Sequence, residues 1–558
     1  MRLILILSIF LILSVFLLSS CGILKKKIYD YSYFPKGAIL TGEMKSGETV
    51  YLIREDSTKM AGIWFNDNNQ AVTEIITFLA DSTGSTNFTH GINSYSGKMT
   101  LKKSMEIKLI LPEIPTLQIV PQTVRLKYLG MIPEKVDCVE RYKQSVFKNI
   151  EVKKDIQYGT ALGYYTSKPS DYISNSDYKH YFSEMLKLSL LHRGFIFDRR
   201  MEQLPLMLDF YQPLNDDIKN RPLLLFVHGG AFFFGDKENR IQKNITDDAV
   251  KKGFTVASIN YRLGTSVTPG AIERTIYRNV QDTRAALRYL VHNKEKYGID
   301  EKQIYLVGSS AGGIISLTTT FMDSNDEYFK NDKGLLRQKE ELGDLDDSGN
   351  NLKNKFKVSG VISMWGGVTH LEMINKRIPT LLFHGTDDRI VPAVEGLPFR
   401  EQMGEFLHRF LSSFGKIYGS ESIYNHLKSN NVPVRYVPFH GAGHDLCINP
   451  DESLNENMDI IRRELSNFLY DNVSNHYFKY RLLGKTIVSK NDLTPVYYLE
   501  NIENDIVQWH VEGGFITNQT NETIQVVWFS SHNLGIVTAC ITNETGVSHK
   551  KEVKVKIN

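Results

Sequence analysis

The sequence predicts an α/β protein: a doubly wound, mostly parallel sheet in the middle of the chain, with a β domain on each side of it. Two patterns predict this. Near-continuous apolar runs separated by helical stretches fill the middle, as in parallel strands that are buried on both faces. Short runs that alternate apolar and polar residues fill both ends, which is typical of antiparallel sheets.

The composition limits the class of protein. The chain has 558 residues, of which 42% are hydrophobic and 23% charged, and its formal net charge is +3. This is a globular composition, long enough for about three or four domains. The small net charge argues against a dedicated nucleic-acid-binding protein, and Cys and His do not occur at zinc-binding spacings. We therefore expect no metal, no cofactor and no nucleic acid.

The first residues predict export. A single charge at Arg2 precedes an apolar run that ends in two serines, and this is the order of a secretory signal peptide, expected at 1–20. The alternative is an uncleaved transmembrane anchor, because the apolar run nearly spans a bilayer. A plain anchor does not require the small residues and the cysteine that follow the run, so we favour the signal peptide.

The Leu-Ser-Ser-Cys ending at 18–21 resembles the bacterial lipobox. The resemblance implies cleavage before Cys21, lipidation of Cys21 and a lipidated tether at 21–28. Several acyl chains give stable membrane attachment. Gly22 rather than Asp follows Cys21, and by the sorting rule of such lipoproteins this implies the outer membrane, with the protein facing the periplasm or the cell surface.

The N-terminal block, expected at 29–135, has runs such as TVYLIRED and TVRLKYLG, separated by turn-forming clusters such as NDNN. This pattern predicts a β-rich domain, and no catalytic constellation is visible in it.

The C-terminal block, expected at 485–558, returns to short β runs and predicts a small β-sandwich. Trp509–Gly514 and Ile524–Trp528 resemble the W-x-V-x-G and V-x-W strands of the immunoglobulin-like PKD fold. That resemblance implies a spacer, or a module that attaches to polymers or partners.

The middle block, expected at 150–472, contains six apolar strand candidates and at least one amphipathic helix. Ile276, Val280, Leu287 and Leu290 recur at helical spacing between two of the strands. The strand candidates lie at 222–228, 255–262, 303–310, 358–365, 379–385 and 434–440.

The run Gly-Ser-Ser-Ala-Gly at 308–312 follows an apolar strand and opens a helix. It is a G-x-S-x-G nucleophile elbow in the strand–turn–helix context that this motif needs, because the glycines permit the sharp turn that exposes the serine. Ser310 is the expected nucleophile. Ser309 is the alternative, but it occupies the x position and is expected to point away.

The run His-Gly-Gly-Ala-Phe at 228–232 ends another apolar strand. It matches the HGGG oxyanion loop of esterases and lipases, with Ala in the last position. The backbone N–H groups of Gly230, Ala231 and Ala311 are the expected oxyanion donors. Alanine keeps its N–H group, so the oxyanion hole should survive. His228 is expected to be structural.

The order nucleophile–acid–base along the chain fixes where the other two residues should lie. His384–Pro392 resembles the HGxxDxxVP pattern, which selects Asp388 as the acid, with Asp387 as the runner-up. The G-x-G-H run at 441–444 selects His444 as the base, whereas His440 is read as a strand-end residue.

Together these motifs resemble the α/β-hydrolase superfamily, and specifically its carboxylesterase and hormone-sensitive-lipase-like branch. The Asn-Tyr-Arg-Leu run at 260–263 and the Asp-Thr-Arg-Ala-Ala run at 282–286 add to the resemblance. It covers about 310 residues of the chain and implies a membrane-anchored serine esterase that acts on short acyl or carbohydrate-linked esters.

Two other functions stay open at this point. The first is a transacylase or peptidase that uses the same triad, because fold and triad do not fix the acceptor. The second is a non-catalytic binding or adhesion lipoprotein that keeps the hydrolase shape. Intact Ser310, Asp388 and His444 argue against the second.

Three further expectations concern the rest of the chain. Cys138, Cys447 and Cys540 lie far apart in sequence, and we predict no disulfide among them. A polar insertion at 323–357 leaves the far end of the nucleophile helix and is expected opposite the active site. The stretch at 397–414 carries Phe399, Phe406, Phe410 and Phe414, which either wall the substrate pocket or only pack their helix onto the core.

Overall fold

The computed structural model divides into two compact units, Met1–Cys138 with Tyr480–Glu544 and Ser548–Asn558, and Val139–Lys479 with Thr545–Val547. The structure describes residues 37–47, 49–54, 59–65, 71–80, 85–90, 93–102, 106–111, 113, 120–131, 138–163, 202–232, 235–264, 271–322, 342–399, 415–449, 451, 453–477, 479–489, 495–528, 533–543 and 547–558. The expected signal peptide, the tether with Cys21, and Phe406, Phe410 and Phe414 lie outside these residues.

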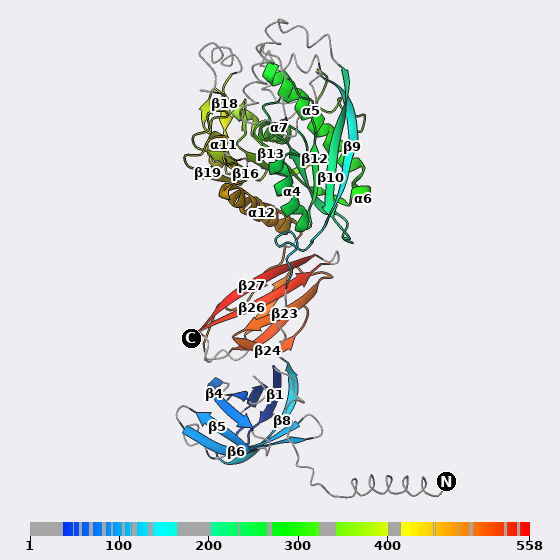
Figure 1. Ribbon diagram of the computed structural model, residues 1–558. Helices are drawn as coiled ribbons and strands as arrows, with labels where there is room; N and C mark the ends of the chain where they lie inside the picture. Colours follow the sequence, from blue (N-terminus) through cyan, green and yellow to red (C-terminus); the bar gives the residue numbers. More distant parts are fainter. Residues whose placement is uncertain are drawn as a thin grey trace, which may run out of the picture. The chain divides into compact units, whose positions relative to one another are not determined.

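The second unit is built on an eight-stranded sheet in the order β19-β16-β14-β13-β11-β12-β10-β9 (Figure 1). The neighbours from β19 to β12 are parallel, and β10 is antiparallel to both β12 and β9. The bounds are β9 Ile150–Gly163, β10 Glu202–Pro213, β11 Arg221–Val227, β12 Thr255–Ile259, β13 Ile299–Ser309, β14 Val358–Met364, β16 Thr380–Gly385 and β19 Val434–Phe439. All six strand candidates of the middle block are confirmed, and β9 and β10 are an antiparallel edge that the apolar runs did not predict.

Helices cover both faces of this sheet. The connection from β11 to β12 and that from β12 to β13 step in opposite directions along the sheet, so right-handed crossovers place their helices on opposite faces. These helices are α4 (Arg240–Lys251) and α5 (Ala271–His292). Helix α12 (Glu456–Tyr477) packs with α4, and α7 (Ala311–Phe321) packs with α5. The remaining described helices are α6 Lys294–Tyr297, α11 Ser420–Ser429 and the short η3 Leu371–Met373.

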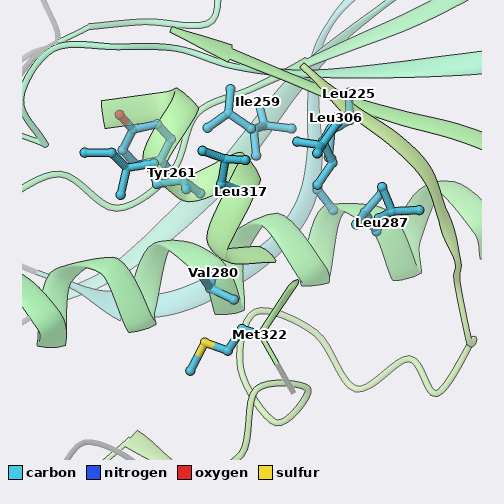
Figure 2. Close-up of a cluster of buried hydrophobic side chains, with 14 of the residues drawn as sticks. Leu225, Ile259, Tyr261, Val280, Leu287, Leu306, Leu317 and Met322 are labelled. Carbon is cyan, nitrogen blue, oxygen red and sulfur yellow. The ribbon is translucent and has the colours of Figure 1, made fainter. Parts of the chain in front are cut away.

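The core of the unit lies between the sheet and α5 with α7. The four α5 residues expected to form an apolar stripe are all buried. Figure 2 shows two of them, Val280 and Leu287, with Leu317 of α7 beside strand residues. The strand residues labelled there are Leu225, Ile259 and Leu306. This packing fixes α7, and with it the start of α7 at the carboxyl edge of the sheet.

The reversal of strand order places the loops after β11 and β13 next to one another. Val227 and Gly308, near the ends of these two parallel strands, are direct partners. Ligands bind at this kind of switch point in open α/β sheets. A small three-stranded sheet completes the unit, with β15 Gly367–Val368, β17 Glu395–Gly396 and β18 Ile417–Gly419.

The first unit contains a closed barrel of eight strands in sequential order, in which β8 pairs with β1. In β7, Ile107, Leu109 and Leu111 are buried and the residues between them are not, which is the period-2 alternation of an antiparallel strand. The strands are β1 Ala38–Glu43, β2 Thr49–Arg54, β3 Lys59–Phe65, β4 Ala71–Ala80, β5 Ser85–His90, β6 Asn93–Lys102, β7 Glu106–Leu111 and β8 Gln122–Met131.

The C-terminal part of the same unit has two four-stranded sheets, in the orders β20-β22-β25-β24 and β21-β27-β26-β23. Buried Trp509 and Val511 lie on β23, and buried Val526 and Trp528 lie on β25. The bounds are β20 Arg481–Leu483, β21 Ile487–Val488, β22 Val496–Glu500, β23 Ile506–Glu512, β24 Gly514–Gln519, β25 Thr523–Trp528, β26 Leu534–Thr542 and β27 Ser548–Ile557.

The cysteines correct one expectation. Cys138 and Cys540 form a disulfide across a sequence separation of 402 residues, and Cys447 is free and buried. The prediction of no disulfide is therefore wrong. It rested on distance along the chain, whereas folding brings Cys138 and β26 together.

In the described part of the chain, no helix has the length and apolar character needed to cross a membrane.

Candidate active site

Ser310 lies at a strained turn between β13 and α7. Its φ of 54° and ψ of −122° are unusual for a residue with a side chain. A Cβ added at Gly308 would lie 2.1 Å from the Gly312 carbonyl oxygen, and one at Gly312 would lie 2.0 Å from that of Val227. Both glycines are therefore required by close backbone contacts, as the elbow motif predicts. Ser309 is buried within β13.

The structure brings Ser310, His444 and Asp388 together from three loops at the carboxyl edge of the sheet. Nε2 of His444 lies 2.9 Å from Oγ of Ser310, and Nδ1 lies 2.7 Å from Oδ2 of Asp388. The runner-up Asp387 is exposed and accepts a hydrogen bond from Thr386 Oγ1 at 3.2 Å. His440 is likewise exposed and directly follows β19.

Asp388 is held as an ionised acceptor. Its Oδ1 accepts hydrogen bonds from the backbone N–H groups of Ile390 and Val391 at 2.9 and 3.0 Å. Burial raises the pKa of this carboxyl group, but the hydrogen bonds from His384 and His444 outweigh burial and keep the pKa well below its usual range. An ionised Asp388 fixes the proton of neutral His444 on Nδ1, so the Nε2 lone pair faces the hydroxyl of Ser310.

The loop after β11 passes directly over the nucleophile. A Cβ added at Gly229 would lie 3.2 Å from Cβ of Ser310. Gly230, Ala231 and Phe232 have φ values of 116°, 51° and 66°, so the backbone is left-handed at three successive residues. Ala231 is not a glycine, so its left-handed backbone conformation is strained. Such a conformation costs about 1–3 kcal/mol for a residue with a side chain.

The three expected oxyanion donors have N–H groups that are not used elsewhere in the described chain. No hydrogen bond there involves the N–H of Gly230 or Ala231. Ala311 is the first residue of α7, and the first N–H groups of a helix have no acceptor within the helix.

His228 has a structural environment. It is fully buried, and burial lowers its pKa to about 4, so the ring is neutral at neutral pH. The ring stacks on Tyr261 with centroids 4.3 Å apart, and the Tyr261 hydroxyl donates to the carbonyl oxygen of His228 at 2.9 Å. These contacts anchor the end of β11, from which the loop starts.

Two neighbours of the triad were not selected from the sequence. His384, on β16, has its Nε2 3.2 Å from Oδ2 of Asp388. Trp365, directly after β14, has a φ of 43°, and its ring lies edge-to-face with that of His444, with centroids 6.5 Å apart. His384 is the first residue of the HGxxDxxVP pattern, so a signal was present for it. Nothing in the sequence marked Trp365.

The family comparison covers the part of the chain that carries the elbow and the oxyanion loop. A family model described as BD-FAE matches residues 208–378. Esterase-5A of Drosophila persimilis is 32% identical over 111 residues, which are 19% of this chain and 20% of that protein. Esterase LipI of Mycobacterium tuberculosis is 30% identical over 107 residues, which are 19% of this chain and 31% of that protein.

Solved structures give weaker similarity. The apo form of Thermogutta terrifontis esterase 2 has a TM-score of 0.33 and 18% identity, covering 48% of this chain and 90% of that one. A truncated form of a carbohydrate esterase from gut microbiota has a TM-score of 0.34 and 16% identity, covering 59% of this chain and 98% of that one.

The match therefore spans about a fifth to a third of the length of the curated relatives. Over residues 208–378 the chain is therefore similar to the BD-FAE family, and the curated relatives that it matches are named esterases.

Proposed function

We propose that this protein is a membrane-anchored serine carboxylesterase that acts through an acyl-enzyme on Ser310. The observation that carries the proposal is the unbroken hydrogen-bond chain from Ser310 through His444 to Asp388 at a nucleophile elbow. An ester hydrolase needs such an activated hydroxyl.

The reaction follows from this geometry. His444 Nε2 takes the proton of Ser310 as Oγ attacks the ester carbonyl, and the imidazolium is stabilised by Asp388. The oxyanion is bound by the N–H groups of Gly230, Ala231 and Ala311, each contributing about 2.7–4 kcal/mol. His444 then protonates the leaving alcohol. Water next attacks the acyl carbon while His444 takes its proton, and the acid leaves as that proton returns to Oγ of Ser310.

Short acyl esters and carbohydrate-linked esters are the proposed substrates, and we propose attachment to the outer membrane through lipid on Cys21. The Cys138–Cys540 disulfide supports export, because disulfides persist in oxidising compartments. The two C-terminal sheets are consistent with a PKD-like spacer.

A fluorophosphonate probe and a panel of p-nitrophenyl esters and acetylated oligosaccharides test the proposal. Parent protein should be labelled and should hydrolyse at least one class of ester. Ser310→Ala should lose both properties, whereas the matched change Ser309→Ala should keep them. Labelling of Ser310→Ala at the parent rate, or a parent that cleaves amides and no ester, would contradict the assignment.

A further inference from the structure

A second histidine contacts the triad carboxylate. His384 is fully buried on β16. Its Nε2 lies 2.8 Å from the carbonyl oxygen of Val391 and 3.2 Å from Oδ2 of Asp388. Its Nδ1 lies 2.7 Å from Oγ of Ser420 and accepts from the Ser420 backbone N–H at 3.4 Å.

These four contacts determine where the proton of His384 lies. The Val391 carbonyl and the Asp388 carboxylate only accept hydrogen bonds, so Nε2 must carry a proton to satisfy them. The Ser420 amide only donates, so Nδ1 must be unprotonated. The proton therefore lies on Nε2, which contacts the Val391 carbonyl oxygen at 2.8 Å and Oδ2 of Asp388 at 3.2 Å.

The contacts of Asp388 show why such a donor matters. Both backbone donors, from Ile390 and Val391, bind Oδ1. They hold Oδ1, so the direction of Oδ2 depends on side-chain contacts. Among the described residues, His444 and His384 are the side chains that contact Oδ2, and His444 is the residue that Asp388 has to orient. His384 is fully buried on β16, so the sheet sets its position.

We propose that His384 is a positioning residue that holds Oδ2 of Asp388 toward His444 through its Nε2–H group. This inference rests on the proposed function of the triad. It also concerns the base strength of His444, because a second donor on Oδ2 draws negative charge from the oxygen that His444 contacts. In the described part of the chain, the titratable groups in contact with Asp388 are His384 from β16 and His444 from the loop after β19.

Two variants separate positioning from packing. The side-chain nitrogen of Gln can occupy the place of His Nε2, so His384→Gln keeps the donor toward Asp388. The side chain of Asn reaches only the place of Nδ1, so His384→Asn keeps a polar contact with Ser420 and loses that donor. A packing role would make the two variants similar.

We expect His384→Gln to stay within about twofold of parent kcat, and His384→Asn to lose about tenfold in kcat with little change in KM. In His384→Asn the charge of Asp388 acts on His444 alone. The imidazolium is then favoured, and the acid limb of the kcat/KM profile should move up by about half a pH unit. Equal losses in both variants, or a parent-like rate and profile in His384→Asn, would overturn the inference.

A measurement without catalysis keeps the inference separate from the proposed function. In parent protein labelled with ¹⁵N-histidine, and with the signal assigned through His384→Gln, the ¹⁵N shifts should place the proton of His384 on Nε2. A proton on Nδ1 or a charged ring overturns the inference, even if His384→Asn fails to fold. If the parent protein hydrolysed no ester, the proposed function would be contradicted and the inference on His384 would still be tested by this measurement.

Discussion

The residues that shape the nucleophile elbow are held by backbone contacts rather than by side chains. Gly312 packs against the end of β11, where an added Cβ would meet the carbonyl oxygens of Val227 and His228 at 2.0 and 2.5 Å. Those carbonyls belong to the strand that leads into the oxyanion loop. A change at Gly312 therefore disturbs both the nucleophile and its oxyanion donors.

Gly312→Ala should destabilise the second unit by about 3 kcal/mol, the upper part of the range for forced overpacking, and should abolish ester turnover. Thermal unfolding and the ester panel measure both effects. Gly443→Ala is the matched control for stability, because a Cβ there meets nothing within 4 Å. Equal unfolding temperatures for the two variants would contradict the close packing at Gly312.

His228 should make stability sensitive to acid. Its pKa is lowered to about 4 by burial, against about 6.5 in an unfolded chain. Above about pH 6.5 neither state is protonated. As the pH falls from about 6.5 to about 4, only the unfolded state takes up the proton, so stability falls over that window.

For His228 alone, this pKa difference predicts that the free energy of unfolding falls by about 2 kcal/mol between pH 7 and pH 5. His228→Phe keeps a ring against Tyr261 and cannot titrate, so it should lose less stability over this interval than parent protein does. Urea unfolding at both pH values measures the difference. The exposed His440 provides the control, His440→Gln, which should behave as parent. If His228→Phe lost as much stability between pH 7 and pH 5 as parent protein does, His228 would not be the source of the acid sensitivity.

At the scale of elements, the described part of the polar insertion, 342–357, is a packed part of the hydrolase unit. Asp346 pairs with Arg284 and Arg288 of α5 at 2.6 Å each. Asn350 donates to the carbonyl oxygens of Tyr158 and Ala285 at 2.9 Å. The segment thus lies along α5 and contacts β9. Residues 323–341 lie outside the described chain.

A deletion through 335–352 would remove these contacts and test folding rather than specificity, so a point change is the better experiment. Asp346→Asn should lower stability by about 1 kcal/mol, since the pairs are partly exposed, and leave the ester preference unchanged. Asp347→Asn, whose partner Lys353 lies 3.8 Å away, should change neither. A shift in ester preference in Asp346→Asn would place the segment at the substrate site.

At the scale of the whole molecule, one covalent bond joins distant parts of the chain. Cys138 follows the barrel strands in sequence, and Cys540 lies on β26. A crosslink that closes so long a loop restricts the unfolded chain strongly in the loop-entropy model.

Non-reducing peptide mapping should recover the Cys138 and Cys540 peptides joined, with Cys447 as a free thiol. The double change Cys138→Ser and Cys540→Ser should lower the stability of the first unit by about 2–4 kcal/mol. Cys447→Ala is the control and should leave the joined peptides intact. Recovery of Cys540 as a free thiol from exported protein would contradict the bond.

Anchoring gives a second prediction at this scale. Cys21→Ser should release the protein from the membrane fraction, because lipidation needs the thiol, and two or more acyl chains are needed for stable attachment. Metabolic labelling with a palmitate analogue and fractionation measure this, and Ser20→Ala keeps the thiol as the control. A Cys21→Ser protein that stays on the membrane with residues 1–20 attached would favour the uncleaved anchor.

Much of this site could be predicted because its signals are local. Each signal predicts a backbone geometry from a few neighbouring residues. The signals are the glycines around Ser310, the apolar strands that end at His228 and His384, and the G-x-G-H run that ends at His444. The central strands were predictable for the same reason, since burial on both faces leaves an unbroken apolar run. The edge strands β9 and β10 give no such run, because one or both of their faces are only partly buried.

The sequence by itself therefore determined the parallel core, the order of the motifs and the identity of the candidate triad. Only the tertiary structure decided the contacts between residues that are far apart in the chain. These include Trp365 beside His444, the shared Oδ2 of Asp388 and the Cys138–Cys540 bond. A local sequence pattern predicts the conformation of its own backbone segment. Contacts between residues that are tens to hundreds of positions apart depend instead on how the packed helices and strands bring their loops together.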